Sequence, residues 1–145
     1  MCGFTGYLSD INNKTSYSDS IIKDMASTIV HRGPDSEGFW KDDLDGIVMG
    51  FRRLAILDIT PNGNQPMISN SGQFIIVFNG EIYNHLSLRE EIDLLRANQN
   101  WLSSSDTETL LCGFDLWGIE ETIKKCTGMF AFTGYLSDIN NKTSY

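Results

Sequence analysis

The sequence has few of the residues that would point to metal binding, nucleic-acid binding or membrane insertion. Its two histidines and three cysteines do not stand at metal-ligand spacings. An odd number of unpatterned cysteines favours reduced thiols and a cytoplasmic protein. Eleven basic residues against nineteen acidic ones give a net charge of −8, which argues against a nucleic-acid interface. We find no signal peptide and no apolar run of the roughly 18–20 residues that a membrane span needs.

The remaining composition is that of an ordinary globular domain. The chain has 145 residues, of which 41% are hydrophobic and 21% are charged, enough for one domain with a buried core. Runs of β-forming residues predict strands at 2–8, Ile47–Phe51, Leu54–Asp58, Phe74–Phe78 and from Met129. The run Phe74–Phe78 is apolar throughout, which predicts a central strand buried on both faces.

Capping residues and apolar spacing predict the helices. Ser16 and Asp19 precede a helix to about Val30. Its predicted buried face is Ile21, Ile22, Met25 and Ile29. Two capping boxes, Ser87 with Glu90 and Ser105 with Glu108, predict helices whose apolar faces are Leu88, Ile92 and Leu95, and Leu110, Leu111, Phe114 and Trp117. A short helix is expected over Ile119–Cys126, and a polar loop over His31–Gly38.

The N-terminus places a cysteine directly after the initiator methionine. Removal of Met1 would give Cys2 a thiol and a free α-amine on one residue. A thiol with a pKa of about 8.5 is mostly protonated at neutral pH, and an α-amine that titrates at about 7.7–8.0 can accept its proton without a histidine. Met1-Cys2 alone is more typical of an unreactive buried cysteine, so the interpretation depends on the motifs that follow.

Two adjacent arginines, Arg52 and Arg53, interrupt the predicted strands. Adjacent residues of a strand point to opposite faces, so one should face solvent and the other should face inward or into a cleft. An inward guanidinium needs a carboxylate partner from the protein or from a ligand. Two solvent-exposed arginines on an edge strand fit the pattern about equally well.

Asn79-Gly80 follows the buried run Phe74–Phe78. Asn-Gly after a strand is typical of a hairpin turn, but no matching second strand follows directly. We therefore expect Gly80 to let the backbone approach another group closely.

The C-terminal segment Phe132–Tyr145 repeats Phe4–Tyr17 letter for letter. Such an identity is unlike the drifted similarity of a solenoid repeat. We divide the chain into residues 1–132 and a strand-like tail, residues 133–145, that copies residues 5–17.

The tail predicts a strand over about Met129–Leu136, paired beside the N-terminal strand. A turn over Ser137–Lys142 should follow it, like the one predicted over Ser9–Lys14. Two identical strand sequences could exchange within or between chains. We therefore expect an exposed sheet edge and a tendency to form homo-oligomers.

Seven motifs occur in a characteristic order. They are Met1–Phe4, Arg32–Asp35 with Gly38, Arg53–Asp58, Gln65–Met67, Asn79–Asn84, Ser105–Glu108 and Gly128–Phe132. In this order they resemble the N-terminal glutaminase domain, a class II glutamine amidotransferase domain, of glutamine-dependent asparagine synthetases. The resemblance covers residues 1–132, and Phe51 departs from the histidine that many relatives carry.

The resemblance implies an α+β fold of the N-terminal-nucleophile hydrolase type, with two stacked antiparallel sheets between layers of helices (αββα). It implies a fold that is incomplete at the C-terminus, because the family's domain continues past Phe132 with further strands. The implied activity is hydrolysis of glutamine to glutamate and ammonia. A synthetase domain, normally in the same chain, would use that ammonia with ATP and Mg²⁺; the resemblance implies no metal or cofactor for this chain itself.

The resemblance also implies catalytic roles. Cys2 would attack the side-chain amide of glutamine and form a thioester, with its own α-amine as base and then as acid. The side chain of Asn79 and the N–H of Gly80 would form the oxyanion hole, which agrees with the physical need for donors fixed near the reacting carbonyl. Arg32 and Asp35 would shape the site without reacting.

The implied substrate-binding residues lie around these. Arg53, with Leu54 and Ile56 beside it, would hold the α-carboxylate of glutamine. Asp106, helped by Glu81, would hold its α-ammonium group. Two alternatives remain open: an inactive fragment of such an enzyme, and the amidotransferase module of a relative that amidates sugars or cell-wall components.

Overall fold

The computed structural model describes residues 2–9, 19–97 and 99–137. These residues form two antiparallel sheets of three strands each. The first sheet has the order β1-β3-β2 and consists of β1 (Gly3–Leu8), β2 (Ser36–Asp42) and β3 (Ile47–Arg53). The second has the order β4-β5-β6 and consists of β4 (Met67–Ile68), β5 (Phe74–Ile82) and β6 (Gly128–Leu136).

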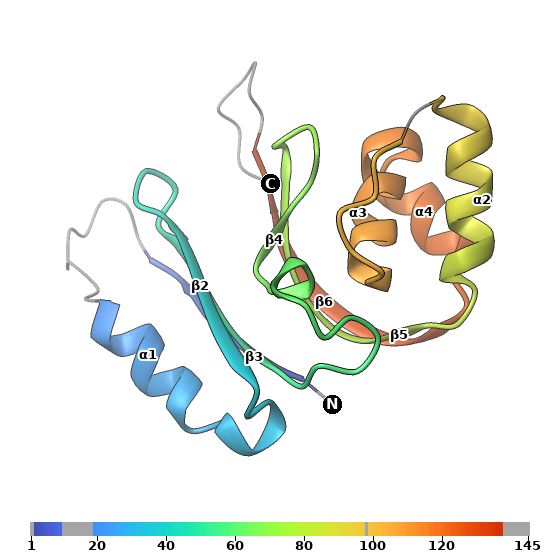
Figure 1. The fold of residues 1–145 in the computed structure, drawn as a ribbon. Helices are drawn as coiled ribbons and strands as arrows, with labels where there is room; N and C mark the ends of the chain where they lie inside the picture. Colours follow the sequence, from blue (N-terminus) through green and yellow to red (C-terminus); the bar gives the residue numbers. More distant parts are fainter. Residues whose placement is uncertain (1, 10–18, 98, 138–145) are drawn as a thin grey trace.

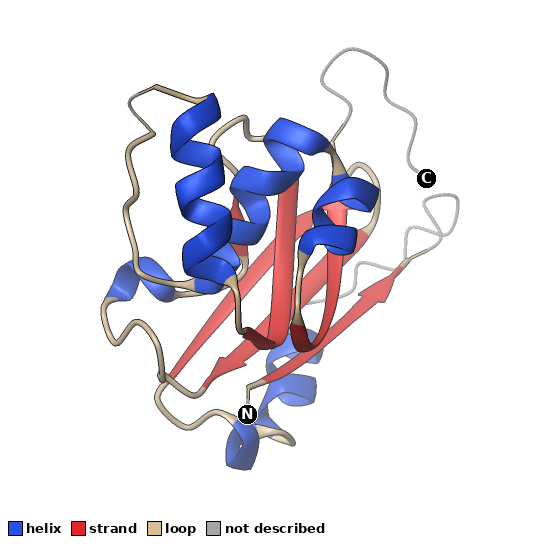
Figure 2. Cartoon of the chain, turned by 90° about the vertical axis from the view of Figure 1, so that its right-hand side faces the viewer, coloured by secondary structure: helices blue, strands red, loops and turns tan. Residues whose placement is uncertain are grey.

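Helices cover the outer face of each sheet, so the described part of the chain has four layers (Figure 1). The helices are α1 (Asp19–Ser27) on the first sheet, and α2 (His85–Leu95), α3 (Asp106–Trp117) and α4 (Ile119–Lys125) on the second. Figure 2 shows α2, α3 and α4 in front of the sheets. The 3₁₀ turns are η1 (Val30–Arg32) and η2 (Pro61–Gly63). The α+β class and the αββα layering are therefore as predicted.

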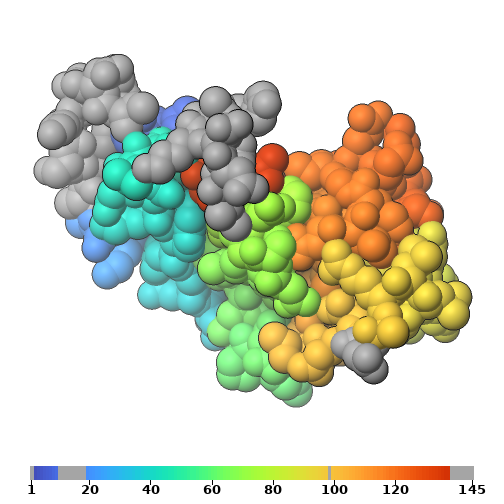
Figure 3. Space-filling model, turned by 90° about the horizontal axis from the view of Figure 1, so that it is seen from above, coloured from blue at the N-terminus to red at the C-terminus, as the bar shows by residue number. Residues whose placement is uncertain are grey.

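Strand β5 is the centre of the second sheet and is buried on both faces, as predicted. Its side chains alternate between two hydrophobic cores because successive residues of a strand point to opposite faces. Phe74, Ile76 and Phe78 pack in the core beneath α2 and α3. Ile75 and Val77 pack against Met49 and Phe51 of β3, in the core between the sheets. Seen from above, α1 and the helices α2–α4 lie at opposite ends of the molecule (Figure 3).

The predicted tail strand is confirmed as part of β6, but the predicted partner was wrong. β6 pairs with β5, for example Phe132 with Phe78, whereas β1 pairs with β3 in the other sheet. The side chain of Asn84 donates to the carbonyl of Lys125 at 2.9 Å, and its Oδ1 accepts the N–H of Thr127 at 2.8 Å. These bonds fix the start of β6 beside the end of β5, so the pairing continues along β5.

The repeated sequence occurs in β1 and in β6, and the two strands turn opposite faces toward the core between the sheets. Phe4 packs against the core between the sheets, whereas the equivalent Phe132 packs against the core beneath the helices. Tyr135 takes the inner position in β6. Both strands are edge strands of their sheets, which agrees with the predicted exposed edge; homo-oligomer formation stays a prediction. The turns predicted over Ser9–Lys14 and Ser137–Lys142 lie mostly outside the described residues.

Two strand predictions were wrong. The sequence gives no alternating signal for β2, yet Ser36–Asp42 pairs with β3 along its whole length. The predicted loop over His31–Gly38 is correspondingly shorter, because η1 and β2 occupy its two ends. The run Leu54–Asp58 is not a strand: the chain leaves β3 after Arg53 and forms irregular structure.

Two helix faces also differ from the prediction. In α1, Ile22 and Ala26 are buried, whereas Ile21 is exposed, and the helix ends at Ser27. α2 begins at His85, before Ser87, and its Leu95 is exposed. Ser16 lies outside the described residues. None of the helices in the described part of the chain is long and apolar enough to cross a membrane.

The start of α3 follows the prediction more closely. Oγ of Ser105 caps the helix by accepting the N–H of Thr107 at 3.1 Å. Glu108 does not close the box on Ser105; it accepts the N–H of Ser103 at 2.8 Å and so orders the segment before the helix. Leu110, Leu111 and Phe114 are buried as predicted, and Trp117 is half-buried.

Candidate active site

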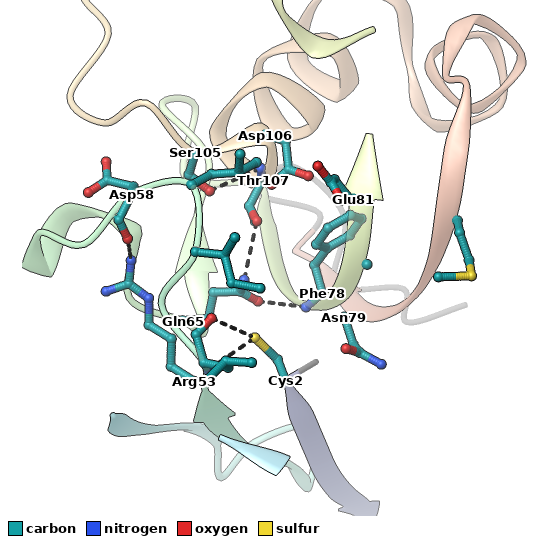
Figure 4. Close-up of a pocket in the computed structure, with 15 residues that line it drawn as sticks. Cys2, Arg53, Asp58, Gln65, Phe78, Asn79, Glu81, Ser105, Asp106 and Thr107 are labelled. Carbon is teal, nitrogen blue, oxygen red and sulfur yellow. Dashed lines mark hydrogen bonds between the residues drawn. The ribbon is translucent and has the colours of Figure 1, made fainter. Parts of the chain in front are cut away.

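A cavity of about 130 Å³ opens between the start of β1, the segment after β3, the second half of β5 and the start of α3 (Figure 4). It holds several times the volume that one water needs. All eight residues to which the sequence assigned catalysis or substrate binding line it: Cys2, Arg53, Leu54, Ile56, Asn79, Gly80, Glu81 and Asp106. The structure therefore brings the candidate residues together, while their roles stay predictions.

Cys2 is half-buried, and its sulfur contacts the backbone of the segment that follows β3. Its Sγ atom accepts the N–H of Leu54 at 3.3 Å and lies 3.5 Å from the carbonyl oxygen of the same residue. The carbonyl of Cys2 accepts two hydrogen bonds from the guanidinium of Arg32, at 3.3 Å and 3.2 Å. Arg32 therefore contacts the backbone of Cys2, and its shaping role stays a prediction.

Arg52 and Arg53 point to opposite faces of β3, as predicted. Arg52 forms an ion pair with Glu37 at 2.7 Å. Arg53 is buried and donates to the carbonyl of Thr60 at 2.7 Å, to Oδ1 of Asn64 at 2.9 Å and to the carbonyl of Asp58. Within the described residues these acceptors are all uncharged, and Arg53 has no ion-pair partner. Its positive charge therefore remains available to an anion in the cavity.

Asp58 organises the segment that carries these contacts, a role that the sequence did not reveal. Its Oδ1 accepts the N–H and the hydroxyl of Thr60 at 2.7 Å and 2.6 Å, and its Oδ2 accepts the N–H of Ser104 at 2.8 Å. Burial opposes ionisation of Asp58, but these hydrogen bonds outweigh it and lower the pKa of the carboxyl group. The ionised side chain thus joins the segment after β3 to the approach to α3.

Asn79 and Gly80 lie inside β5 and not after its end. Gly80 pairs with Phe130 of β6, and a Cβ at Gly80 would collide with the backbone of Phe130 and Met129. The expected close approach is therefore confirmed, and the approaching group is β6. Oδ1 of Asn79 is buried without a hydrogen-bond partner among the described residues. Asn79 also lines a second cavity of about 260 Å³ that shares Cys2 with the first.

The opposite end of the cavity is acidic. Asp106, the first residue of α3, is buried, and its Oδ2 accepts the N–H of Ile82 at 2.9 Å. Burial raises the pKa of Asp106, and this effect exceeds the lowering by the Ile82 hydrogen bond. Glu81 is exposed at the same end. A cation bound there would offset the cost of burying the Asp106 charge.

The residues that sequence reasoning missed include Gln65, Thr107 and Met129, which also line the cavity. All three belong to recognised motifs but had no assigned role. The other two cysteines lie outside the cavity lining; burial raises the pKa of Cys112 to about 12, in agreement with a packing thiol. No group of three or more potential metal ligands occurs among the residues that the structure describes.

Comparison with known proteins adds three findings. Residues 1–143 match the glutamine amidotransferase domain family. Over 137 residues the chain is 44% identical to asparagine synthetase [glutamine-hydrolyzing] 1 of Bacillus subtilis (strain 168), a match that covers 91% of this chain and 20% of the relative. Over 122 residues it is 40% identical to the putative asparagine synthetase [glutamine-hydrolyzing] of Mycobacterium bovis, covering 78% of this chain and 18% of the relative. The chain thus spans about a fifth of the length of these relatives.

A solved structure shares the fold. The glutamine phosphoribosylpyrophosphate amidotransferase of B. subtilis superposes with a TM-score of 0.67 at 16% identity, over 93% of this chain and 34% of that chain. At this identity the likeness concerns the fold alone. It agrees with the predicted N-terminal-nucleophile hydrolase architecture.

Proposed function

This chain belongs to the family of glutamine amidotransferase domains, and we propose that it hydrolyses the side-chain amide of glutamine with Cys2 as the nucleophile. The observation that carries the proposal is the layout of the cavity. The Cys2 thiol lies in a cavity that the guanidinium of Arg53 and the carboxylates of Glu81 and Asp106 also line. A third lining carboxylate, Asp58, is already bonded to Thr60 and Ser104. A free amino acid offers one charge of each sign to such a site, whereas a glutamine within a peptide does not.

In the proposed reaction, the thiol proton of Cys2 passes to the residue's own α-amine as Sγ attacks the amide carbon. The negative charge that develops on the amide oxygen is stabilised by the side-chain amide of Asn79 and by the N–H of Gly80. The carbon–nitrogen bond then breaks, and the leaving nitrogen takes the proton from the α-ammonium group and departs as ammonia. A thioester between Cys2 and the glutamyl group remains.

Water completes the cycle. The α-amine accepts a proton from the attacking water, a carbon–oxygen bond forms, and the sulfur leaves and regains its proton, giving glutamate and free Cys2. Arg53 would hold the α-carboxylate throughout by charge-assisted hydrogen bonds. Asp106 and Glu81 would hold the α-ammonium group.

We propose that the reaction that uses the ammonia takes place in a different domain. The relatives named asparagine synthetase are more than four times as long as this chain, so we propose that ammonia passes to a synthetase domain of that kind, with its ATP and Mg²⁺. Residues 1–132 would then need no metal or cofactor of their own. A cytoplasmic protein is supported by the three cysteines, all free in the structure.

Ammonia release from three compounds tests the proposal. We expect the purified chain to release ammonia from L-glutamine, and far less from N-acetyl-L-glutamine or L-glutamine α-amide, each of which lacks one charged end. Cys126→Ser is the matched cysteine control and should keep the activity. Equal turnover of all three compounds would contradict the charge-based selection, and no turnover of L-glutamine would favour the inactive fragment.

A further inference from the structure

Gln65 lies in the wall of the cavity with both ends of its side-chain amide engaged. Its Oε1 accepts the backbone N–H of Phe78 at 2.6 Å, and its Nε2 donates to Oγ1 of Thr107 at 3.2 Å. Gln65 is 7% exposed, so water does not compete for these bonds. The side chain therefore ties β5 to the first turn of α3.

The edge of β5 that faces the cavity is mostly without a neighbouring strand. β4 pairs only with Ile75 and Ile76, whereas β6 pairs with the opposite edge through Ile82. Side chains replace the missing strand: Phe78 donates to Gln65, and Ile82 donates to Oδ2 of Asp106. Two side-chain acceptors thus hold this edge at residues four apart.

The N–H of Gly80 lies midway between these two anchors. Backbone N–H groups of a strand alternate between its two edges, so residues 78, 80 and 82 point the same way. Phe74 continues the same alternation, because its N–H donates to Oγ of Ser69 on the β4 side at 3.2 Å. The N–H of Gly80 therefore leaves β5 at the open edge, and Gly80 lines the same cavity as Cys2 and Gln65.

We propose that Gln65 is a positioning residue that, by holding the N–H of Phe78, aims the N–H of Gly80 at the oxygen of the reacting amide. This inference rests on the proposed function. Asp106 anchors the other side of Gly80, so loss of Gln65 would leave the edge held at one point. Misplacement of a reacting group by about 1 Å can cost 100-fold in rate, so a small shift of this edge is sufficient.

The first sheet fixes Gln65 in turn. Gly38 of β2 packs directly against the carbonyl of Gln65, where a Cβ would find no space. Gly38 pairs with Phe51 of β3 and is thus rigidly placed. This contact gives a physical reason for the glycine of the Arg32–Asp35 motif: it lets β2 support the residue that holds β5.

Gln65→Met tests the proposal, because it keeps the length of the side chain and removes both hydrogen bonds. We expect its kcat to fall about 10- to 100-fold with a KM within about threefold of wild type. Gln65→Glu keeps the acceptor for Phe78 and should recover part of the kcat. Gln99→Met is the matched control: the amide of Gln99 donates to Sγ of Cys112 at 3.4 Å, outside the cavity lining, and kcat should not change.

Amide hydrogen exchange provides a readout that needs no turnover. In Gln65→Met the amide proton of Phe78 should exchange faster, while those of Val77 and Asn79, on the β6 edge, stay protected. Unchanged exchange at Phe78 would overturn the proposal, even in a chain without glutaminase activity.

The kinetic outcomes separate this proposal from the proposed function. Wild-type turnover with an unchanged kcat in Gln65→Met would overturn the positioning role alone. A fall in kcat accompanied by a large rise in KM and a loss of thermal stability would show a merely structural role, and would also overturn it. An inactive wild-type chain would contradict the proposed function instead.

Discussion

The backbone N–H of Leu54 donates to the sulfur of Cys2 across 3.3 Å, although the two residues are 52 positions apart in the chain. Leu54 directly follows Arg53, whose guanidinium is held by the loop that continues to Asn64. One short segment therefore orients both the candidate nucleophile and the candidate carboxylate-binding group. The relative position of thiol and guanidinium is set by backbone geometry, which is more rigid than contact between two flexible side chains.

Selective alkylation should separate Cys2 from Cys112. Burial raises the pKa of Cys112 to about 12, so at pH 8 only roughly one molecule in ten thousand carries its thiolate. Iodoacetamide at pH 8 should therefore modify half-buried Cys2 and leave Cys112 intact in the folded chain. Peptide mass mapping checks this, and equal labelling of the two residues would contradict the assigned environments.

Replacing Arg53 with alanine should weaken glutamine binding. Charge-assisted hydrogen bonds contribute about 1.5–3 kcal/mol each, so we expect KM to rise about 10- to 100-fold with little change in kcat. Arg52→Ala is the matched control, because Arg52 is on the opposite face, where it pairs with Glu37, and its KM should match wild type. A lower kcat with an unchanged KM in Arg53→Ala would show that its role is wrongly assigned.

Asp106→Asn should have opposite effects on stability and on glutamine binding: the folded state should be no less stable, and binding should be weaker. Asparagine keeps an acceptor for the N–H of Ile82 and removes a buried charge, so at pH 7 the variant should be at least as stable as wild type. The pKa of Asp106 is raised in the folded state. The free energy of unfolding of the wild type therefore rises as the pH falls through this raised pKa. The difference in this free energy between Asp106→Asn and wild type should close near pH 4.

The binding half of this prediction is a higher KM for glutamine, since the partner of the α-ammonium group is lost. Thermal unfolding across pH 4–8 and steady-state kinetics measure the two parts separately. A variant that is less stable than wild type at pH 7, and whose KM is unchanged, would show that Asp106 serves the fold alone.

Tyr135→Phe should reduce stability. The hydroxyl of Tyr135 donates to Asp45, and its ring contacts Trp40 at a centroid distance of 5.3 Å, so this residue joins β6 to the other sheet. Loss of the hydroxyl should lower the free energy of unfolding by about 0.5–1.5 kcal/mol. Chemical denaturation measures this loss, with Tyr83→Phe as an exposed control. Equal stability of the two variants would mean that the contact to Asp45 contributes nothing.

The sequence predicted the parts of the fold that have strong local signals. The apolar run of β5 and the Ser105 cap of α3 depend on nearby residues, and both form as expected. β2 could not be found this way, because its pattern of half-buried and exposed residues lacks alternation and its pairing with β3 is not local. The apolar run after Arg53 has the composition of a strand, but the hydrogen bonds of Asp58 hold it as irregular structure.

The candidate site was predicted more completely than the fold around it. Cys2, Asn79 and Asp106 line one cavity, as the resemblance implied. The prediction succeeded because each residue belongs to a motif several residues long, and the motif specifies the local backbone as well as the side chain. The partner of β6 was mispredicted because the sequence of Phe4–Leu8 fits either sheet, with opposite faces inward. The anchoring role of Gln65 depends on Phe78 and Thr107, which are distant in the chain, so no sequence pattern reveals it.

The most direct test of the account is the intact mass of a chain that is actively releasing ammonia from L-glutamine. An acid-quenched sample should lack Met1 and should include a fraction that carries a glutamyl group on Cys2, whereas Cys2→Ala should be inactive and carry none. This result would establish an N-terminal cysteine whose α-amine is free to serve as the base. Full activity in a sample that retains Met1, or in the Cys2→Ala chain, would contradict the central claim.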